Sequence, residues 1–128
     1  MKSAFNPLQV AIYGALNGVI SCPVYDAVPE GAAWPYMVIG ETTGVDWSTK
    51  LENGQVVTIT LHGWSRAKGT KEVNDLMDEA LQALTGPALS VTDFTLVLLR
   101  FDFASVIRDP DGITRHGMLR LRGLLEEV

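Results

Sequence analysis

The sequence has few of the residues that anchor disulfide scaffolds or metal clusters. Among its 128 residues there is one cysteine, Cys22, so no disulfide can form within the chain. Cys22 precedes Pro23 in an apolar stretch, and we expect it to be a buried, inert thiol. Without a cysteine framework, a reducing cytoplasm is the expected compartment.

A basic leader and long hydrophobic runs are also missing. The first residues, MKSAFNP, lack the basic region and apolar core of a secretion signal. The longest apolar run is far shorter than the ~20 residues that span a bilayer. We therefore expect neither export by that route nor a membrane partner.

Positive charge is scarce as well. Ten Lys and Arg against fifteen Asp and Glu give a net charge of −5. Proteins that bind free nucleic acid rely largely on excess Lys and Arg, so the composition argues against that partner. It leaves open a pore through which DNA passes, because a mildly acidic wall would keep DNA from sticking.

The apolar residues present are sufficient for one globular domain, which we expect to span residues 1–128. Asn6 can cap a first helix, with Pro7 in its first turn. Its apolar side recurs at three- and four-residue spacing: Leu8, Ala11, Ile12, Ala15, Leu16, Val19 and Ile20. Thr70 can cap a second helix, which Gly86 and Pro87 end. The core-facing side of that helix would carry Val73, Leu76, Met77, Ala80, Leu81 and Leu84.

Strands are predicted where apolar and polar residues alternate between turn signals. They cover residues 23–26 (a short edge strand), 36–43, 55–65, 94–107 and 113–125, with a polar loop over 44–53. Within 55–65, Val57, Ile59 and Leu61 would point one way. Thr58, Thr60, His62 and Trp64 would point the other. The predicted class is α+β: an antiparallel sheet of four or five strands with two main helices packed against it.

No residue pattern predicts catalysis or ligand binding. His62 and His116 have no second ligand at helical spacing, and we expect solvated strand histidines. A nucleophile elbow and a glycine-rich phosphate loop are absent. Asp109 and Asp111 flank a turn proline but lack the rest of a calcium loop. We therefore predict no catalytic residue, no metal and no cofactor.

Large amphipathic residues instead suggest contacts with other proteins. Trp47 and Lys50 lie in the polar loop, while Trp64 and Arg66 lie at the end of a strand. Trp and Arg are enriched at the energetic centres of interfaces. For Trp47 we favour a contact with another subunit, whereas for Trp64 a core position and an interface position are equally supported.

Three ordered stretches carry a family resemblance. They are PVYDAVPEGAAWPYMVIGE at 23–41, then WSTK at 47–50 with TLHGWSR at 60–66, and HGMLRLR at 116–122. In this order and spacing the chain, from about residue 8 to residue 126, resembles the tail-completion, or tail-terminator, proteins. These belong to phages with long non-contractile tails, to prophages and to gene transfer agents. Gly63 departs from many relatives, which carry a β-branched residue before the tryptophan.

The resemblance implies a compact α+β subunit that forms a ring, usually a hexamer. The ring would sit at the head-proximal end of the tail tube, stop its polymerisation and offer a surface for joining the head. The implied partners are copies of the chain itself, the tail tube protein and a head–tail connector or stopper protein. DNA would pass through the ring without sequence-specific binding. Assembly would take place in the host cytoplasm, and the final location would be the head–tail junction of the virion.

Two other functions stay open. One is a different ring of the head–tail junction, such as a connector or stopper. The other is a small-molecule-binding or hydrolytic enzyme that uses His62 or His116. An enzyme of that kind would have a pocket holding a histidine with a perturbed pKa.

Overall fold

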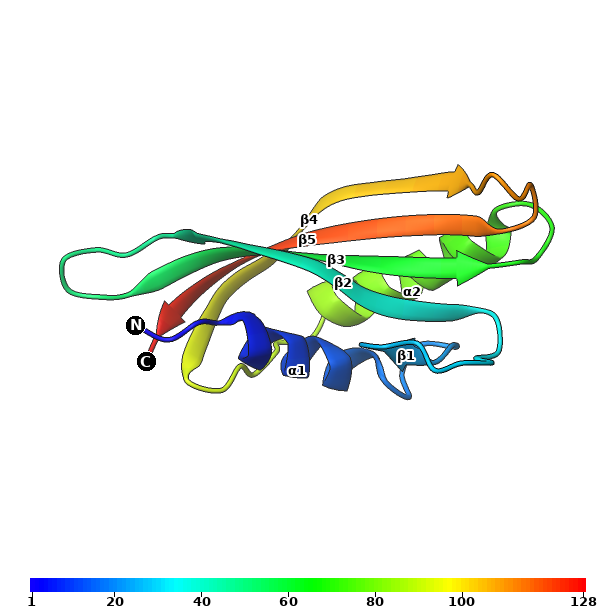
Figure 1. Cartoon of the computed structure of the whole chain (residues 1–128). Helices are drawn as coiled ribbons and strands as arrows, with labels where there is room; N and C mark the ends of the chain where they lie inside the picture. Colours follow the sequence, from blue (N-terminus) through cyan, green and yellow to red (C-terminus); the bar gives the residue numbers. More distant parts are fainter.

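The computed structural model describes all 128 residues and confirms the α+β class (Figure 1). Two helices and five strands follow one another along the chain. Their bounds are α1 (Phe5–Leu16), β1 (Val24–Tyr25), β2 (Tyr36–Asp46), β3 (Gly54–Ser65), α2 (Lys71–Thr85), β4 (Phe94–Arg108) and β5 (Arg115–Glu127).

The five strands form one sheet in the order β1-β2-β3-β5-β4. β1 runs parallel to β2, whereas all other neighbouring pairs are antiparallel. The expectation of a purely antiparallel sheet was therefore wrong, because the sheet is mixed. The segment 26–35 between β1 and β2 carries the chain back to the end where β1 began, as a parallel pair requires.

The hairpin of β2 and β3 is longer than the sequence pattern indicated. β2 continues to Asp46, and Gly44, Val45 and Asp46 pair with residues of β3. The loop therefore spans 47–53, not 44–53, and the predicted end of the strand at residue 43 was wrong. Exposed residues can continue a strand here because backbone pairing, and not side-chain burial, holds this end of the hairpin.

Helix α1 begins two residues earlier than expected and ends sooner. Ala4, and not Asn6, occupies the cap position, and no side chain caps the helix. The helix ends at Leu16, where Gly18 adopts a positive φ of 77° that side-chain-bearing residues rarely accept. Beyond that turn Ile20 is still buried, whereas Val19 is 67% exposed, so Val19 was wrongly assigned to the core side.

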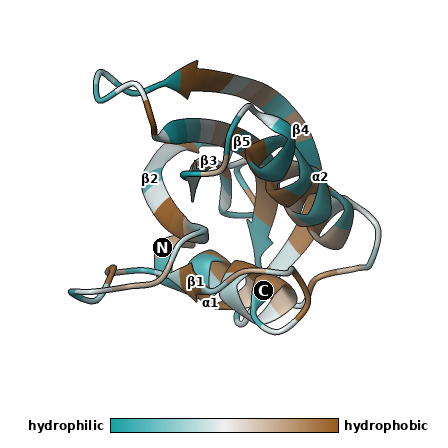
Figure 2. Cartoon of the chain, turned by 90° about the vertical axis from the view of Figure 1, so that its right-hand side faces the viewer, coloured by the Kyte–Doolittle hydropathy of each residue, from teal (hydrophilic) through white to brown (hydrophobic).

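Both helices lie on the same side of the curved sheet, with hydrophobic surface turned toward it (Figure 2). On β3 the predicted alternation is confirmed: Val57, Ile59 and Leu61 are fully buried, and the intervening residues are half-buried on the opposite face. The fully buried side chains from α1, the sheet and α2 join in one core: Leu8, Ile12, Leu16, Met37, Ile59, Leu61, Leu84, Leu119, Leu121 and Leu125.

Helix α2 packs as its apolar spacing predicted. Four of its residues are buried, Val73, Leu76, Ala80 and Leu84, while Met77 and Leu81 are half-buried against the core. Thr70 stands at the cap position, but its hydroxyl does not bond a backbone N–H of the first turn. Gly86 occupies the C-cap position, where the helix was expected to end.

A glycine of the sheet, Gly117, lets α2 approach closely. Gly63 of β3 and Gly117 of β5 are cross-strand partners beneath Val73 and Met77. A methyl group on Gly117 would come within 2.5 Å of the Met77 sulfur, which is far inside normal contact. A methyl group on Gly63 would lie 3.5 Å from Val73, an ordinary contact, so the close approach of α2 depends on Gly117.

Cys22 is buried, as expected. Burial, followed by the nearby charges of Glu79 and Glu72, raises the pKa of its thiol to about 11. The thiol is therefore protonated at neutral pH, and a protonated thiol is a poor nucleophile.

We predict different costs for two leucines of α2. Leu84→Ala removes a fully buried side chain and should lower the free energy of unfolding by about 2–5 kcal/mol. Leu81→Ala should cost clearly less, because Leu81 is only half-buried. Urea denaturation of both variants measures the difference, and an equal or larger cost at Leu81 would contradict this packing.

Candidate interaction surfaces

The four residues predicted as interface anchors lie at the two ends of the β2–β3 hairpin. Trp47 and Lys50 belong to the loop at its tip, which projects beyond the rest of the molecule (Figure 1). Trp64 is near the end of β3, and Arg66 follows that strand. The structure therefore divides the predicted set into two sites.

The hairpin tip is closed by its own hydrogen bonds. The Trp47 amide donates to the Gly54 carbonyl over 2.8 Å, and the Thr49 amide donates to the Glu52 carbonyl over 2.8 Å. The Trp47 indole lies on Gly54 and remains 41% exposed. Leu51 is 94% exposed, and Lys50 forms no ion pair in the chain. The tip thus presents an indole, an apolar side chain and a free ammonium group to solvent.

At the other end, Trp64 lies on the sheet face opposite the helices. Its ring stacks on His116 with centroids 3.8 Å apart and an angle of 7° between the planes. The Arg66 guanidinium lies 4.3 Å from the ring centre of Trp34, and its Nε donates to the Thr114 hydroxyl. Trp64 is therefore neither a core residue nor a freely exposed one.

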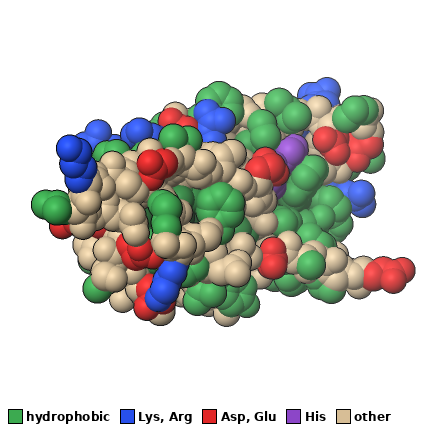
Figure 3. Space-filling view, turned by 60° about the vertical axis from the view of Figure 1, so that its left-hand side comes forward, with side chains coloured by type: hydrophobic (Ala, Val, Ile, Leu, Met, Phe, Trp, Pro, Cys, Tyr) green, Lys and Arg blue, Asp and Glu red, His purple; other side chains and the backbone are tan.

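The two histidines form a chain of hydrogen bonds that the sequence did not reveal. His62 Nδ1 lies 2.7 Å from His116 Nε2, and His62 Nε2 lies 2.7 Å from the Glu41 carboxylate. The expectation of solvated strand histidines was wrong, because β3 and β5 bring the two rings into contact. Their surface lies among hydrophobic side chains (Figure 3). The alternation on each strand was visible in the sequence, but the register that joins them was not.

The electrostatics of this chain favour a neutral His116. Burial, and then the neighbouring His62, lower the pKa of His116 below its usual value. The hydrogen bond from His62 lowers the pKa of Glu41. Positive charges on both rings would repel each other across this contact.

A groove of about 410 Å³ lies over this cluster, between the segment after β1 and the sheet. It meets part of the condition set for an enzyme, since it holds a histidine with a shifted pKa. Its lining offers no Ser, Thr, Cys or Lys nucleophile: Val28, Tyr36, Val38, Gly40, Glu41, His62, Trp64 and His116. Both ring nitrogens of His62 already have partners within the chain.

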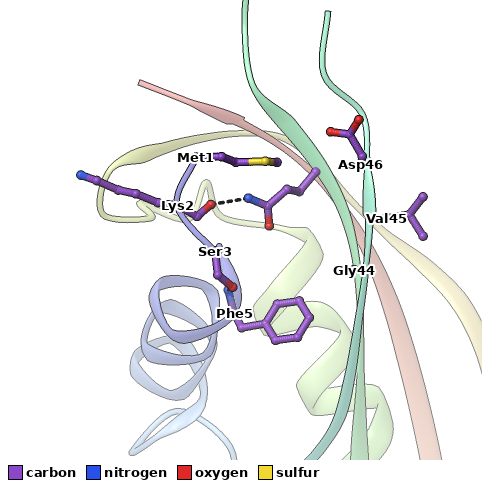
Figure 4. Close-up of a pocket in the computed structure, with 8 residues that line it drawn as sticks. Met1, Lys2, Ser3, Phe5, Gly44, Val45 and Asp46 are labelled. Atoms are coloured by element: carbon purple, nitrogen blue, oxygen red, sulfur yellow. Dashed lines mark hydrogen bonds between the residues drawn. The ribbon is translucent and has the colours of Figure 1, made fainter.

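A second hollow, of about 350 Å³, lies between the N-terminal segment and β2 (Figure 4). The amide of Gln55 donates to the Lys2 carbonyl, and its side-chain oxygen accepts from the Ala4 amide. The ring of Phe5 lies over Gly44. These contacts fix the first residues to the sheet, and Lys2 also bonds Glu127 near the other terminus.

The acidic turn after β4 is a structural element. Asp111 accepts hydrogen bonds from the amides of Ile113 and Thr114 and from the Thr114 hydroxyl, and these lower its pKa to about 2. No group of three or more His, Cys, Asp or Glu side chains is arranged to hold a metal ion. Neither helix has the length and hydrophobicity of a membrane span.

The sequence reasoning overlooked one further surface. β4 is the edge strand at one end of the sheet, and Phe101, Phe103 and Ile107 on it are 43–53% exposed. Two features of the sequence would have revealed this surface. The strand is apolar on both faces, and its hairpin carries five of the six arginines.

Taken together, these features describe a small α+β subunit that carries large apolar and charged side chains at its surface. The chain belongs to the family of the tail completion protein gp17, whose model matches residues 10–126. This is a family of phage tail proteins. The tail completion protein gp17 of Bacillus phage SPP1 is 35% identical over 89 residues, which cover 70% of this chain and 66% of that protein.

Two solved structures are also similar. A chain in the virion of a native gene transfer agent particle is 27% identical and superposes with a TM-score of 0.89, covering 98% of this chain and 99% of that one. The structure of the bacteriophage SPP1 gp17 protein is 28% identical, with a TM-score of 0.54, covering 94% of this chain and 84% of that one. The family resemblance read from the sequence is thus confirmed.

We predict that the histidine cluster makes stability depend on pH. Because the pKa of His116 is lowered in the folded state, the unfolded chain binds more protons between that value and the usual 6.5. The free energy of unfolding should therefore rise with pH through this window and level off above about 6.5. Urea midpoints from pH 5 to 8 measure it. His116→Gln should flatten the rise, and an unchanged slope would contradict the assignment.

Proposed function

We propose that this protein completes a phage tail. It would bind the head-proximal end of the tail tube as a hexameric ring, stop further polymerisation and provide the surface that joins the head. The observation that carries the proposal is the similarity, over nearly its whole length, to a subunit of an assembled virion. Family membership supports the same function.

The physics of rings is consistent with the exposed surfaces. A closed ring of identical subunits needs two different patches, one on each side of the subunit. It also needs a face that binds the last ring of the tube. In this proposal the hairpin tip with Trp47 and Lys50 contacts the tube or a neighbour. The opposite ring face lacks what would be needed to add another tube ring.

The partners follow from this location. They are other copies of the chain, the tail tube protein and the connector or stopper of the head, with DNA passing through the ring without sequence-specific binding. We place assembly in the host cytoplasm and the mature protein at the head–tail junction. The protein would act by binding alone and would not be an enzyme.

Removal of the protein distinguishes tail completion from the role of a stopper. Particles that lack it should carry overlong tails, because nothing ends tube growth. Tail length and head content in electron micrographs measure this. Tails of normal length on heads that leak DNA would contradict tail completion and indicate a stopper ring.

We also predict that the hairpin tip is a docking element. Trp47→Ala combined with Lys50→Glu should reduce capping of tubes and leave the melting temperature almost unchanged, because both side chains are exposed. Burying one tryptophan at an interface centre contributes about 2–4 kcal/mol. Val19→Ala, at a second exposed apolar site, is the control. Normal capping by the double variant would make the tip a passive connection, and a large drop in melting temperature would return Trp47 to the core.

A further inference from the structure

The edge of the sheet formed by β4 combines exposed aromatic rings with unpaired positive charge. Phe103 is 43% exposed, with the Arg120 guanidinium 5.0 Å from its ring centre. Arg100, on the same face, has no ion pair or side-chain hydrogen bond. Arg100 faces Arg122 directly across the β4–β5 ladder, and Arg122 is also unpaired. Like charges placed opposite each other in a sheet are destabilising. Neither arginine has a carboxylate partner in the chain, so a carboxylate from another molecule would stabilise the pair.

A second surface has the complementary features. A groove of about 220 Å³ lies between α1 and β2, with apolar walls formed by Val10, Tyr13 and Ile39. Asp26 lies at this groove and makes no ion pair or hydrogen bond in the chain. This volume is below the range of about 300–1,000 Å³ that is typical of small-molecule pockets. An apolar hollow with an unpaired carboxylate beside it can instead bind an aromatic side chain that has a positively charged side chain next to it.

The two surfaces belong to different parts of the sheet. The second half of β4 runs along the top of Figure 1, and α1 and β1 lie at the bottom. β4 and β1 are also the two ends of the strand order. If the β4 surface of each subunit binds the groove of the next, every contact repeats the same rotation, as a heterologous ring requires. Contact between two β4 edges would instead place Arg100 close to its own copy.

We propose, on the basis of the ring assigned above, that the β4 edge of one subunit docks into the α1–β2 groove of a second copy. Phe103 enters the groove between Val10 and Tyr13 of the second copy, and Arg100 pairs with its Asp26. The net charge of −5 makes self-association costly unless such local pairs offset it. The exposed backbone of the edge strand lies along the same contact.

Two one-sided variants test this contact. Phe103→Asp damages only the edge, and Val10→Asp damages only the groove; both positions are exposed, so the melting temperature should be unchanged. Each variant alone should be monomeric by native mass spectrometry and should bind purified tail tubes at least about tenfold more weakly than the wild type. An equimolar mixture should form a one-to-one heterodimer, because each variant keeps one intact surface. Val19→Asp, at a 67% exposed position, should assemble as the wild type does.

The charged pair is tested by exchange. Arg100→Asp and Asp26→Arg should each weaken assembly, and the double variant should regain most of it.

If Phe103→Asp lowers the melting temperature, Ile107→Asp replaces it on the same edge. Normal rings on tube ends from both one-sided variants would overturn this interface while leaving tail completion intact. Failure of the wild type to cap tubes at all would overturn tail completion itself. Normal rings with lost DNA retention in Arg100→Gln would assign the arginine to DNA and also overturn the contact.

Discussion

The antiparallel ladder between β3 and β5 is the constraint on which the rest of the molecule depends. Every residue of β3 from Gly54 to Ser65 has a partner in β5, without a bulge. This register stacks Ile59 on Leu121 and Leu61 on Leu119 in the core. The same register places Gly63 opposite Gly117, which seats α2. A slip of one residue would turn each of these side chains to the other face.

The ladder also determines what the molecule presents to partners. Because the core faces one side, the opposite face receives His62, Trp64 and His116, which shield one another by stacking and hydrogen bonding. Because β3 and β5 occupy the middle of the sheet, the edges fall to β1 and β4. Bulges interrupt the pairing of β4 with β5 after Leu96 and after Phe101, and the strand leaves aromatic side chains uncovered at this edge. A subunit with two unlike edges is suited to building a closed ring.

Much of this fold could be predicted from local sequence patterns. The spacing of Val73, Leu76, Ala80 and Leu84 indicated α2, and the turn around Pro110 indicated the last hairpin. The α+β class and the family followed from the order of such segments. Sequence patterns did not show the parallel pairing of β1, because direction depends on the path of a loop and not on residue type. They also missed the contact of His62 with His116, since register is a long-range property.

The four residues expected to mediate contacts fall into two groups in the structure. Trp47 and Lys50 are exposed at the hairpin tip, as an anchor on a polar loop should be. Trp64 and Arg66 instead have aromatic partners, His116 and Trp34, within the chain. Single-residue enrichment at interfaces cannot tell these cases apart, because an indole gains from stacking on any flat neighbour.

The central claim is that this subunit closes a tail tube. The most direct test is to add the purified protein to purified tail tubes and measure how many copies bind, and where, by mass measurement and electron microscopy. The account predicts one hexameric ring at a single end of each tube and no further tube growth afterwards. Binding along the tube wall, open-ended stacking of the protein, or continued growth after binding would contradict it.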